Sequence, residues 1–134
     1  MNITYKDTKV LEPAELQNLF LSVEWSSGHY PEKLAVAMQN SDSVFTAWEN
    51  GKLIGLINAL DDSIMTAYIH YLLVDPDHQG KGIGKKLVSL ITDKYKDYSR
   101  IVLIAYDRET GFYQNCGFEI GREKVPMFIT SLWT

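Results

Sequence analysis

The sequence has little of three things: cysteine, long apolar runs and excess positive charge. Cys116 is the single cysteine among 134 residues, so no internal disulfide forms and nothing indicates an oxidising compartment. No apolar run approaches the roughly 18 residues of a membrane span, and the amino-terminal segment lacks the apolar core of a signal peptide. A net charge of −4 argues against binding to nucleic acid or to an anionic membrane. We therefore expect a cytoplasmic protein with no membrane or nucleic-acid partner.

Linkers rich in proline and glycine, internal repeats and low-complexity segments are missing too. Hydrophobic residues make up 46% of the chain and charged residues 22%, which is typical of a chain that packs its own core without structural metals. The length of 134 residues is near the commonest domain size. We therefore predict a single domain over residues 1–134.

Hydrophobic periodicity divides the chain into strands and helices. In chain order it predicts a strand over 3–6, helices beginning at Pro13 and Pro31, strands over 43–48, 53–60 and 66–74, a helix over 82–95, a strand over 100–106, a helix over 110–116, and one or two strands within 118–133. Asn50-Gly51 between two of these strands is a strong hairpin signal. The continuous apolar run at 100–106 is typical of a strand buried on both faces.

The resulting order is β-α-α-β-β-β-α-β-α-β. It combines antiparallel hairpins with one strand–helix–strand crossover, so the sheet is mixed. We predict an α/β (α+β) fold with a mainly antiparallel central sheet flanked by helices.

The segment 74–87, VDPDHQGKGIGKKL, carries the strongest functional signal. It places alternate glycines and several lysines between a strand and an amphipathic helix, and the N–H groups at a helix N-terminus bind phosphate. A P-loop is excluded because Lys86 follows Gly84-Lys85 where serine or threonine is needed, and a dinucleotide fingerprint lacks its third glycine. The remaining alternative is a glycine-rich turn with solvated lysines.

The pattern Gln79-x-x-Gly82-x-Gly84, after Val74-Asp75-Pro76, resembles the acetyl-CoA signature of the GNAT superfamily. The resemblance implies that the loop amides wrap the coenzyme's pyrophosphate and that the preceding strand binds the pantetheine arm. It covers the element order of nearly the whole chain. The coenzyme-binding residues that it implies are Leu72, Leu73, Val74, Gln79, Gly80, Lys81, Gly82, Ile83, Gly84 and Lys85.

A second block, GFYQNCGF at 111–118, resembles a later element of the same superfamily. The resemblance implies that Tyr113 approaches the coenzyme sulfur. A phenol has a pKa of about 10, close enough to that of a thiol, about 8.5, to deliver a proton to the leaving group. The alternative is that Tyr113, one of eight tyrosines, only packs the short helix.

Acetyl transfer also requires a neutral amine, and therefore a base or water to take its proton. Many members of the superfamily use a glutamate on the strand before the glycine loop, and this strand has none. His70 is the best substitute because the unperturbed pKa of a histidine is about 6.5. Water as proton acceptor is equally compatible with the sequence.

The acceptor pocket in this superfamily is formed by the first helices, their connecting loop and the C-terminal strands. Aromatic side chains and one acid in these regions suit an arylalkylamine through stacking and ion pairing. The layout resembles the branch of serotonin N-acetyltransferases, but polyamines, aminoglycosides, amino acids and peptides remain alternatives. The candidate substrate residues are Glu24, Trp25, His29, Tyr30, Tyr68 and Phe128.

Two other classes of function compete with the transferase. One is a non-catalytic acyl-CoA sensor or regulatory module, and the other is a nucleotide-binding protein of another fold. Cys116 has no histidine nearby and no activating motif, so we reject it as a nucleophile. His29 and His78 show no metal-ligand spacing, so acetyl-CoA is the expected cosubstrate, without a metal. Both a monomer and a homodimer fit the sequence.

Overall fold

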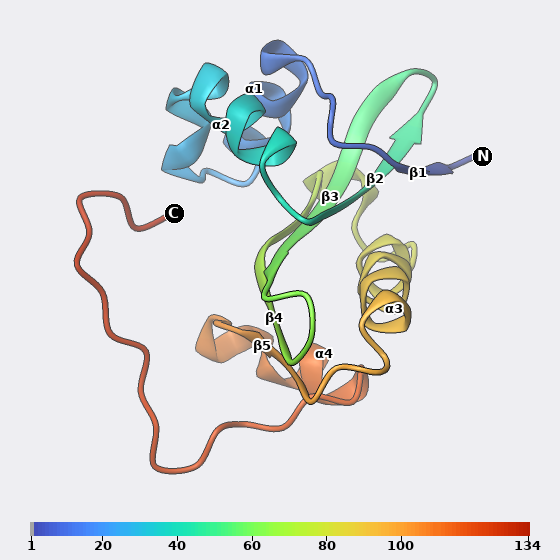
Figure 1. Cartoon of the computed structure of the whole chain (residues 1–134). Helices are drawn as coiled ribbons and strands as arrows, with labels where there is room; N and C mark the ends of the chain where they lie inside the picture. Colours follow the sequence, from blue (N-terminus) through green and yellow to red (C-terminus); the bar gives the residue numbers. More distant parts are fainter. Residues whose placement is uncertain (1) are drawn as a thin grey trace.

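The computed structural model describes residues 2–134 and has the predicted α/β architecture (Figure 1). Five strands form one sheet in the order β1-β2-β3-β4-β5. Their bounds are Thr4–Asp7 for β1, Ser43–Glu49 for β2, Lys52–Asp61 for β3, Thr66–Val74 for β4 and Arg100–Leu103 for β5. Within residues 2–134, none of the helices is both long and apolar enough to cross a membrane.

The sheet is mixed, as predicted. Strands β1 to β4 pair antiparallel with their neighbours, whereas β4 and β5 pair parallel. The β2–β3 hairpin turns through Asn50 and Gly51, whose φ angles of 51° and 77° are those of the hairpin turn that Asn-Gly favours. The crossover from β4 to β5 runs through helix α3 (Ile83–Lys94). Parallel strands require such a crossover.

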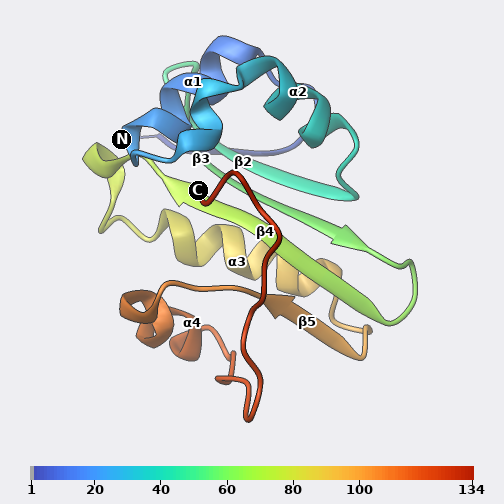
Figure 2. The same cartoon turned by 90° about the vertical axis from the view of Figure 1, so that its left-hand side faces the viewer.

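Helices cover both faces of the sheet (Figures 1 and 2). Helices α1 (Pro13–Ser22) and α2 (Pro31–Gln39) bury one apolar face each on one side. Helix α3 packs on the other side, where side chains of α4 (Thr110–Asn115) join the same cluster. The largest buried side chains of the two clusters include Leu16, Phe20 and Met38 on the first side and Leu87, Ile91 and Tyr95 on the second.

The run at 100–106 forms a shorter and more exposed strand than predicted. Strand β5 lies at the edge of the sheet and ends at Leu103. Val102 is 42% exposed and Ile104 is 47% exposed. The prediction of burial on both faces is therefore wrong, because an apolar run does not reveal whether a second layer covers it.

The strands predicted within 118–133 do not form: residues 118–134 contain neither helix nor strand. Pro126 cannot donate to a ladder, and Glu123 has a φ of 57°, which turns the chain out of the extended conformation. The tail instead crosses in front of β4 (Figure 2). It ends at the 3-10 helix η1 (Ser26–His29), where the N–H of Ser27 donates to the Thr134 carbonyl at 2.8 Å.

A β-bulge in β4 determines which side chains reach the site. Ile57 pairs with Leu72 and Ala59 with Ile69, so two residues of β4, His70 and Tyr71, lie opposite the single residue Asn58. The buried Asn58 side chain accepts a hydrogen bond from the N–H of Tyr71 at 2.9 Å and replaces the lost ladder bond. The bulge brings the rings of His70 and Tyr71 into a stack, with centroids 4.0 Å apart.

Candidate active site

A cleft opens where β4 and β5 stop pairing. Their last paired residues are Ile69 and Leu103, and beyond them the two chains separate. A cavity of about 700 Å³ lies in this gap. Its lining comes from the ends of both strands, the glycine loop, α4 and the segment after α1. The cleft therefore joins segments from both faces of the sheet.

One wall of the cleft offers backbone N–H groups of β4. The N–H groups of Tyr71 and Asp75 point toward β3, where they donate to Asn58 Oδ1 at 2.9 Å and to the Ile54 carbonyl at 2.8 Å. Because N–H directions alternate along a strand, those of Leu72 and Val74 point to the opposite edge. That edge faces the cleft, since β5 has already separated there. An extended ligand chain can bind these groups as an added strand does.

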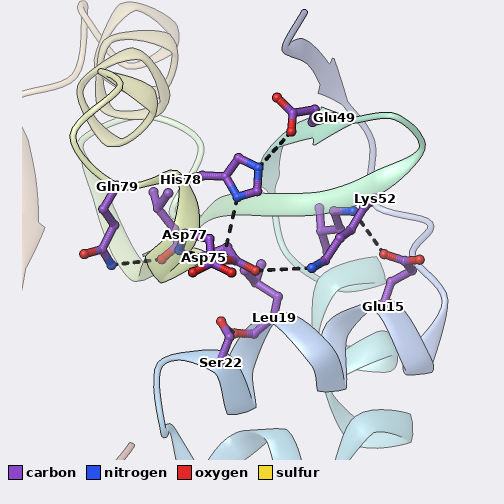
Figure 3. Close-up of polar contacts among 11 residues, drawn as sticks. Glu15, Leu19, Ser22, Glu49, Lys52, Asp75, Asp77, His78 and Gln79 are labelled. Carbon is purple, nitrogen blue, oxygen red and sulfur yellow. Dashed lines mark hydrogen bonds and ion pairs between the residues drawn. The ribbon is translucent and has the colours of Figure 1, made fainter. Parts of the chain in front are cut away.

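The turn after β4 is held by side chains (Figure 3). Asp75 accepts a hydrogen bond from the N–H of Asp77 at 2.9 Å and so caps the 3-10 helix η2 (Pro76–His78). The Gln79 side chain donates to the Val74 carbonyl at 3.0 Å. These two bonds fix the direction in which the chain enters the glycine loop.

Glycine is required in that loop by the backbone. Gly80 has a φ of 82° and Gly82, the N-cap of α3, has a φ of 80°. Both values lie in the left-handed region that other residues rarely adopt. No atom of residues 2–134 lies within 4 Å of a Cβ built at either position, so these residues leave open space beside the loop backbone. A ligand can therefore approach the main chain closely.

The first turn of α3 presents N–H groups to this space. The first hydrogen bond of the helix is the one that the N–H of Lys86 donates to the Gly82 carbonyl at 3.0 Å. The N–H groups of Ile83, Gly84 and Lys85 precede that bond, and no acceptor within residues 2–134 is bonded to them. The N–H of Gln79, by contrast, already donates to the Pro76 carbonyl at 3.4 Å. The anion-binding groups are therefore those at the helix mouth.

Tyr113 extends from α4 into the cleft. Its ring lies edge-on to Phe112 and Phe118, with centroids 5.1 and 5.9 Å away. Burial raises the pKa of Tyr113 to about 12, so its hydroxyl stays protonated at neutral pH. A phenol with that pKa donates a hydrogen bond to a thiolate more readily than it gives up its proton completely.

His70 belongs to β4 and lines the cleft. Its ring stacks between Tyr71 at 4.0 Å and Tyr68 at 5.7 Å. The residue is exposed as a whole, yet its flanked ring loses enough water contact to lower the pKa of His70 below the usual 6.5. The ring is therefore mostly neutral at neutral pH, which is the form that accepts a proton.

Glu24 and Trp25 reach the cleft from the end of α1. The N–H of Trp25 donates to the Phe20 carbonyl and that of Glu24 to the Leu21 carbonyl, both at 3.0 Å, which is the Schellman ending of a helix. Glu24 has a φ of 62° at the position where this ending favours glycine. Glutamate is less stable than glycine in this left-handed conformation. The helix ending itself therefore does not explain why a glutamate stands here.

The structure brings most predicted site residues to one cleft. Those that line it are Glu24, Trp25, His70, Leu72, Leu73, Val74, Gln79, Gly80, Gly82, Ile83, Gly84, Lys85 and Tyr113. Five predicted residues do not line it: His29, Tyr30, Tyr68, Lys81 and Phe128. Tyr68 still contacts the His70 ring, whereas Phe128 lies in the tail and packs on Trp133.

Sequence reasoning missed the wall beyond β5. Ile104, Ala105, Tyr106 and Arg108 line the cleft, together with Phe112 of α4. The guanidinium of Arg108 lies 4.6 Å from the Tyr106 ring. The available signal was their place directly after a strand, because ligands of α/β sheets bind beyond the strands' carboxyl ends.

Two other predicted features concern cysteine and metals. Cys116 is half-buried against the α3 cluster, and burial raises the pKa of its thiol. A thiol that holds its proton in this way is a poor nucleophile. Within residues 2–134, His, Cys, Asp and Glu side chains form no group of three that could hold a metal ion.

The known proteins that this chain resembles are acetyltransferases. Residues 10–118 match the model of the acetyltransferase (GNAT) family. GCN5-related N-acetyltransferase 2, chloroplastic, of Arabidopsis thaliana is 35% identical over 133 residues, which cover 83% of this chain and 51% of that protein. An N-acetyltransferase of Prochlorococcus marinus, ycf52-like, is 30% identical over 122 residues, which cover 87% of this chain and 67% of that protein. The chain spans about half the length of the first curated relatives it matches.

A solved structure shares the fold over almost the whole chain. The GNAT-family acetyltransferase of Streptococcus pneumoniae superposes with a TM-score of 0.83 at 25% identity. The superposition covers 97% of this chain and 98% of that protein. The arrangement of sheet and helices is thus the one found in that acetyltransferase.

Proposed function

Because the chain belongs to the acetyltransferase (GNAT) family, we propose that it transfers the acetyl group of acetyl-CoA to the amino group of a small molecule. We propose an arylalkylamine as the acceptor class, with peptides as the second candidate. The observation that carries this proposal is one cleft that joins an anion-binding helix mouth, a protonated phenol, a neutral imidazole and an acidic aromatic rim.

The coenzyme fits the groups that the cleft offers. The N–H groups at the start of α3 suit its diphosphate, and Lys85 adds a positive charge beside them. The N–H groups of Leu72 and Val74 suit the amides of the pantetheine arm. When bound, acetyl-CoA supplies the activated acetyl group as a thioester.

Transfer requires two proton movements, and the cleft has one group for each. The amine nitrogen attacks the thioester carbonyl carbon, the carbon–sulfur bond breaks, and the thiolate leaves. We assign the amine's proton to His70, directly or through water, because its ring is neutral at neutral pH. We assign the stabilisation of the thiolate to the Tyr113 hydroxyl, and that of the oxyanion to a free N–H of β4.

Recognition of the amine rests on the rim formed by Glu24 and Trp25. The Glu24 carboxylate carries the charge that an alkylammonium group pairs with before it loses its proton. Trp25 packs on Phe20 and Tyr71, with centroids 6.1 and 6.0 Å away, and this fixes an aromatic surface beside the acid. Glu24 is a strained residue, because its backbone has a left-handed conformation. Strained residues cluster at functional sites, so the strain supports a role for Glu24 in binding.

Two substitutions of Glu24 separate binding from stability. We expect Glu24→Gln to raise the KM for the amine about 10-fold with little change in kcat, because a charged hydrogen bond is lost. Glu24→Gly should raise KM as much and also raise the free energy of unfolding by about 1 kcal/mol, because glycine adopts positive φ without strain. Steady-state kinetics measure KM and kcat of the two variants, and denaturant unfolding measures their stability. Glu32→Gln, at an exposed position of α2, is the matched control, and an unchanged KM for Glu24→Gln would remove Glu24 from the amine site.

The pH profile tests His70 as the base. The base acts in its neutral form, so kcat/KM should rise with pH and level off above the pKa of His70, which lies below 6.5. His70→Gln should lower kcat about 100-fold and abolish this acid limb. If His70→Gln keeps both the acid limb of the pH profile and the wild-type kcat, water takes the amine's proton without help from His70.

The proposed function itself is tested by a screen of amines with acetyl-CoA that detects free thiol. We expect arylalkylamines to release thiol faster than polyamines or amino acids. Binding of acetyl-CoA without thiol release for any amine or peptide would instead support an acyl-CoA sensor. ATP should not displace the coenzyme, since the P-loop features that would hold it are missing.

A further inference from the structure

Tyr71 connects the His70 ring to the rest of the molecule. The two rings lie almost parallel, with their centroids 4.0 Å apart and their planes at 22°. Neighbouring side chains of a regular strand point to opposite faces, so this contact follows from the bulge at these two residues. Tyr71 itself is not among the residues that line the cleft. An effect of Tyr71 on the reaction therefore has to pass through a neighbour.

The backbone of Tyr71 is held by a buried polar network. Asn58 accepts the hydrogen bond from the Tyr71 N–H with Oδ1 and donates from Nδ2 to Oγ of Ser41 at 3.0 Å. The Ser41 hydroxyl in turn donates to the Ala37 carbonyl at 2.8 Å. Asn58 and Ser41 are each 2% exposed, so little water competes with these bonds. The network fixes the Tyr71 backbone relative to β3 and the end of α2.

The hydroxyl of Tyr71 is held at the other end of the side chain. It lies 2.9 Å from Oγ of Ser27, a buried residue of η1. The Ser27 hydroxyl donates its own proton to the Thr134 carbonyl at 2.7 Å, because a carbonyl oxygen only accepts. The Tyr71 hydroxyl is therefore the donor in its bond to Ser27.

Aromatic side chains from α1 and the segment after it fix the plane of the Tyr71 ring. Phe20 meets the ring edge-on, with centroids 4.9 Å apart and planes at 84°, and the Trp25 centroid lies 6.0 Å away. His70, by contrast, is an exposed residue. An exposed side chain has several rotamers available, and stacking on a ring that is itself fixed favours one of them.

We propose that Tyr71 is a positioning residue for acetyl transfer: its ring, anchored through the hydroxyl to Ser27, keeps the His70 imidazole in the orientation that takes the amine's proton. The proposal rests on the proposed function, because it takes His70 to be the base. A base has to lie within hydrogen-bond reach of the proton that it removes, so an imidazole that is free to turn reacts more slowly. Tyr71 keeps its own proton throughout, in the bond to Ser27.

Two substitutions break the same hydrogen bond from opposite sides. Tyr71→Phe removes the donor and keeps the ring, and Ser27→Ala removes the acceptor. Each should lower kcat about fivefold and leave the KM for acetyl-CoA within about twofold. The double variant should be no slower than the slower single variant, since only one bond is lost. Steady-state kinetics with acetyl-CoA and the acceptor that releases thiol fastest in the amine screen measure these values.

The His70→Gln background separates positioning from a general effect on the fold. If Tyr71 acts through His70, Tyr71→Phe should cause no further loss of kcat once His70 is replaced. A purely structural contribution would lower kcat by the same factor in both backgrounds. Ser89→Ala on the exposed side of α3 and Tyr98→Phe beyond its end are the matched controls, and both should keep the wild-type kcat.

NMR of the histidine rings tests the orientation without catalysis. The chain has three histidines, and the signals of His70 are those missing from the His70→Gln spectrum. A stacked aromatic ring shifts the protons of its neighbour upfield. We expect the upfield shift of the His70 ring protons to be largest in the wild type, smaller in Tyr71→Phe and Ser27→Ala, and smallest in Tyr71→Leu. Ser27→Ala keeps both measurements available if Tyr71→Phe does not fold.

The outcomes distinguish this role from the function on which it rests. Wild-type kcat, or an unchanged His70 shift, in both Tyr71→Phe and Ser27→Ala would overturn the role of Tyr71 and leave the proposed function intact. Equal losses of kcat with and without His70 would overturn it as well, since Tyr71 would then act on the fold. Absence of thiol release by the wild type with every acceptor would overturn both.

Discussion

Tyr113→Phe is expected to lower kcat by about 100-fold and to leave the dissociation constant of CoA within about twofold. The variant keeps the ring that packs against Phe112 and Phe118 and removes only the hydroxyl. The loss falls on the step in which negative charge develops on sulfur, so it should affect kcat and kcat/KM alike. Steady-state kinetics together with calorimetric titration of CoA separate the two quantities.

Tyr98→Phe is the matched control for this substitution, because Tyr98 lies beyond the end of α3, where it packs on Tyr95. It should keep the wild-type kcat. Since burial raises the pKa of Tyr113 to about 12, we expect no loss of rate from its ionisation below about pH 10. A wild-type kcat for Tyr113→Phe would mean that solvent, and not Tyr113, stabilises the leaving thiolate. Tyr113 would then have no part in the mechanism.

Gly82→Val should weaken CoA binding by at least about 10-fold and lower the free energy of unfolding by about 2 kcal/mol. Gly82 has a φ of 80°, and valine, which is branched at Cβ, is strongly disfavoured there. A Cβ at this position meets no atom of residues 2–134 within 4 Å, so we expect the effect to come from the backbone. Relief of the strain would rotate the N-terminal N–H groups of α3 away from the ligand.

Gly111→Ala provides the control, because Gly111 lies in α4 without a positive φ, and a Cβ there meets no atom of residues 2–134 within 4 Å. It should bind CoA as the wild type does. Calorimetry measures the affinity, and denaturant unfolding measures the stability. Tight CoA binding by a folded Gly82→Val protein would mean that the left-handed N-cap does not shape the coenzyme site.

The parts of the fold that depend on local sequence were predictable. The bounds of β4, Thr66–Val74, are those predicted, and α3 is one residue shorter at each end than the predicted 82–95. The Asn50-Gly51 turn follows from two residues that tolerate positive φ. In each case the determining residues lie within the element or next to it, so periodicity and turn chemistry were sufficient.

The parts that depend on distant partners were not predictable. The bulge at His70 and Tyr71 is stabilised by Asn58 on the neighbouring strand, and nothing within β4 signals it. The tail has apolar residues at strand spacing, but it pairs with no strand of the described part of the chain and is irregular. A strand needs a neighbour as well as a pattern.

The candidate site divides in the same way. The coenzyme loop is a contiguous segment whose glycines, lysines and helix start are all visible in the sequence. The acceptor side is assembled from separate segments, and there His29, Tyr30 and Phe128 proved to lie outside the cleft. The strain at Glu24 was also invisible, because it arises from the Schellman ending of α1. Residues that meet only through tertiary packing require the structure.

The most direct measurement is an NMR titration of the 15N-labelled protein with CoA, which follows the backbone amide resonances. The N–H groups of Ile83, Gly84 and Lys85 have no acceptor among the described residues 2–134 and should gain one on the diphosphate. Their resonances should shift most, and 3′,5′-ADP, which lacks the pantetheine arm and the second phosphate of the diphosphate, should shift them less. Saturating CoA binding with these three resonances unmoved would contradict a diphosphate site at the mouth of α3.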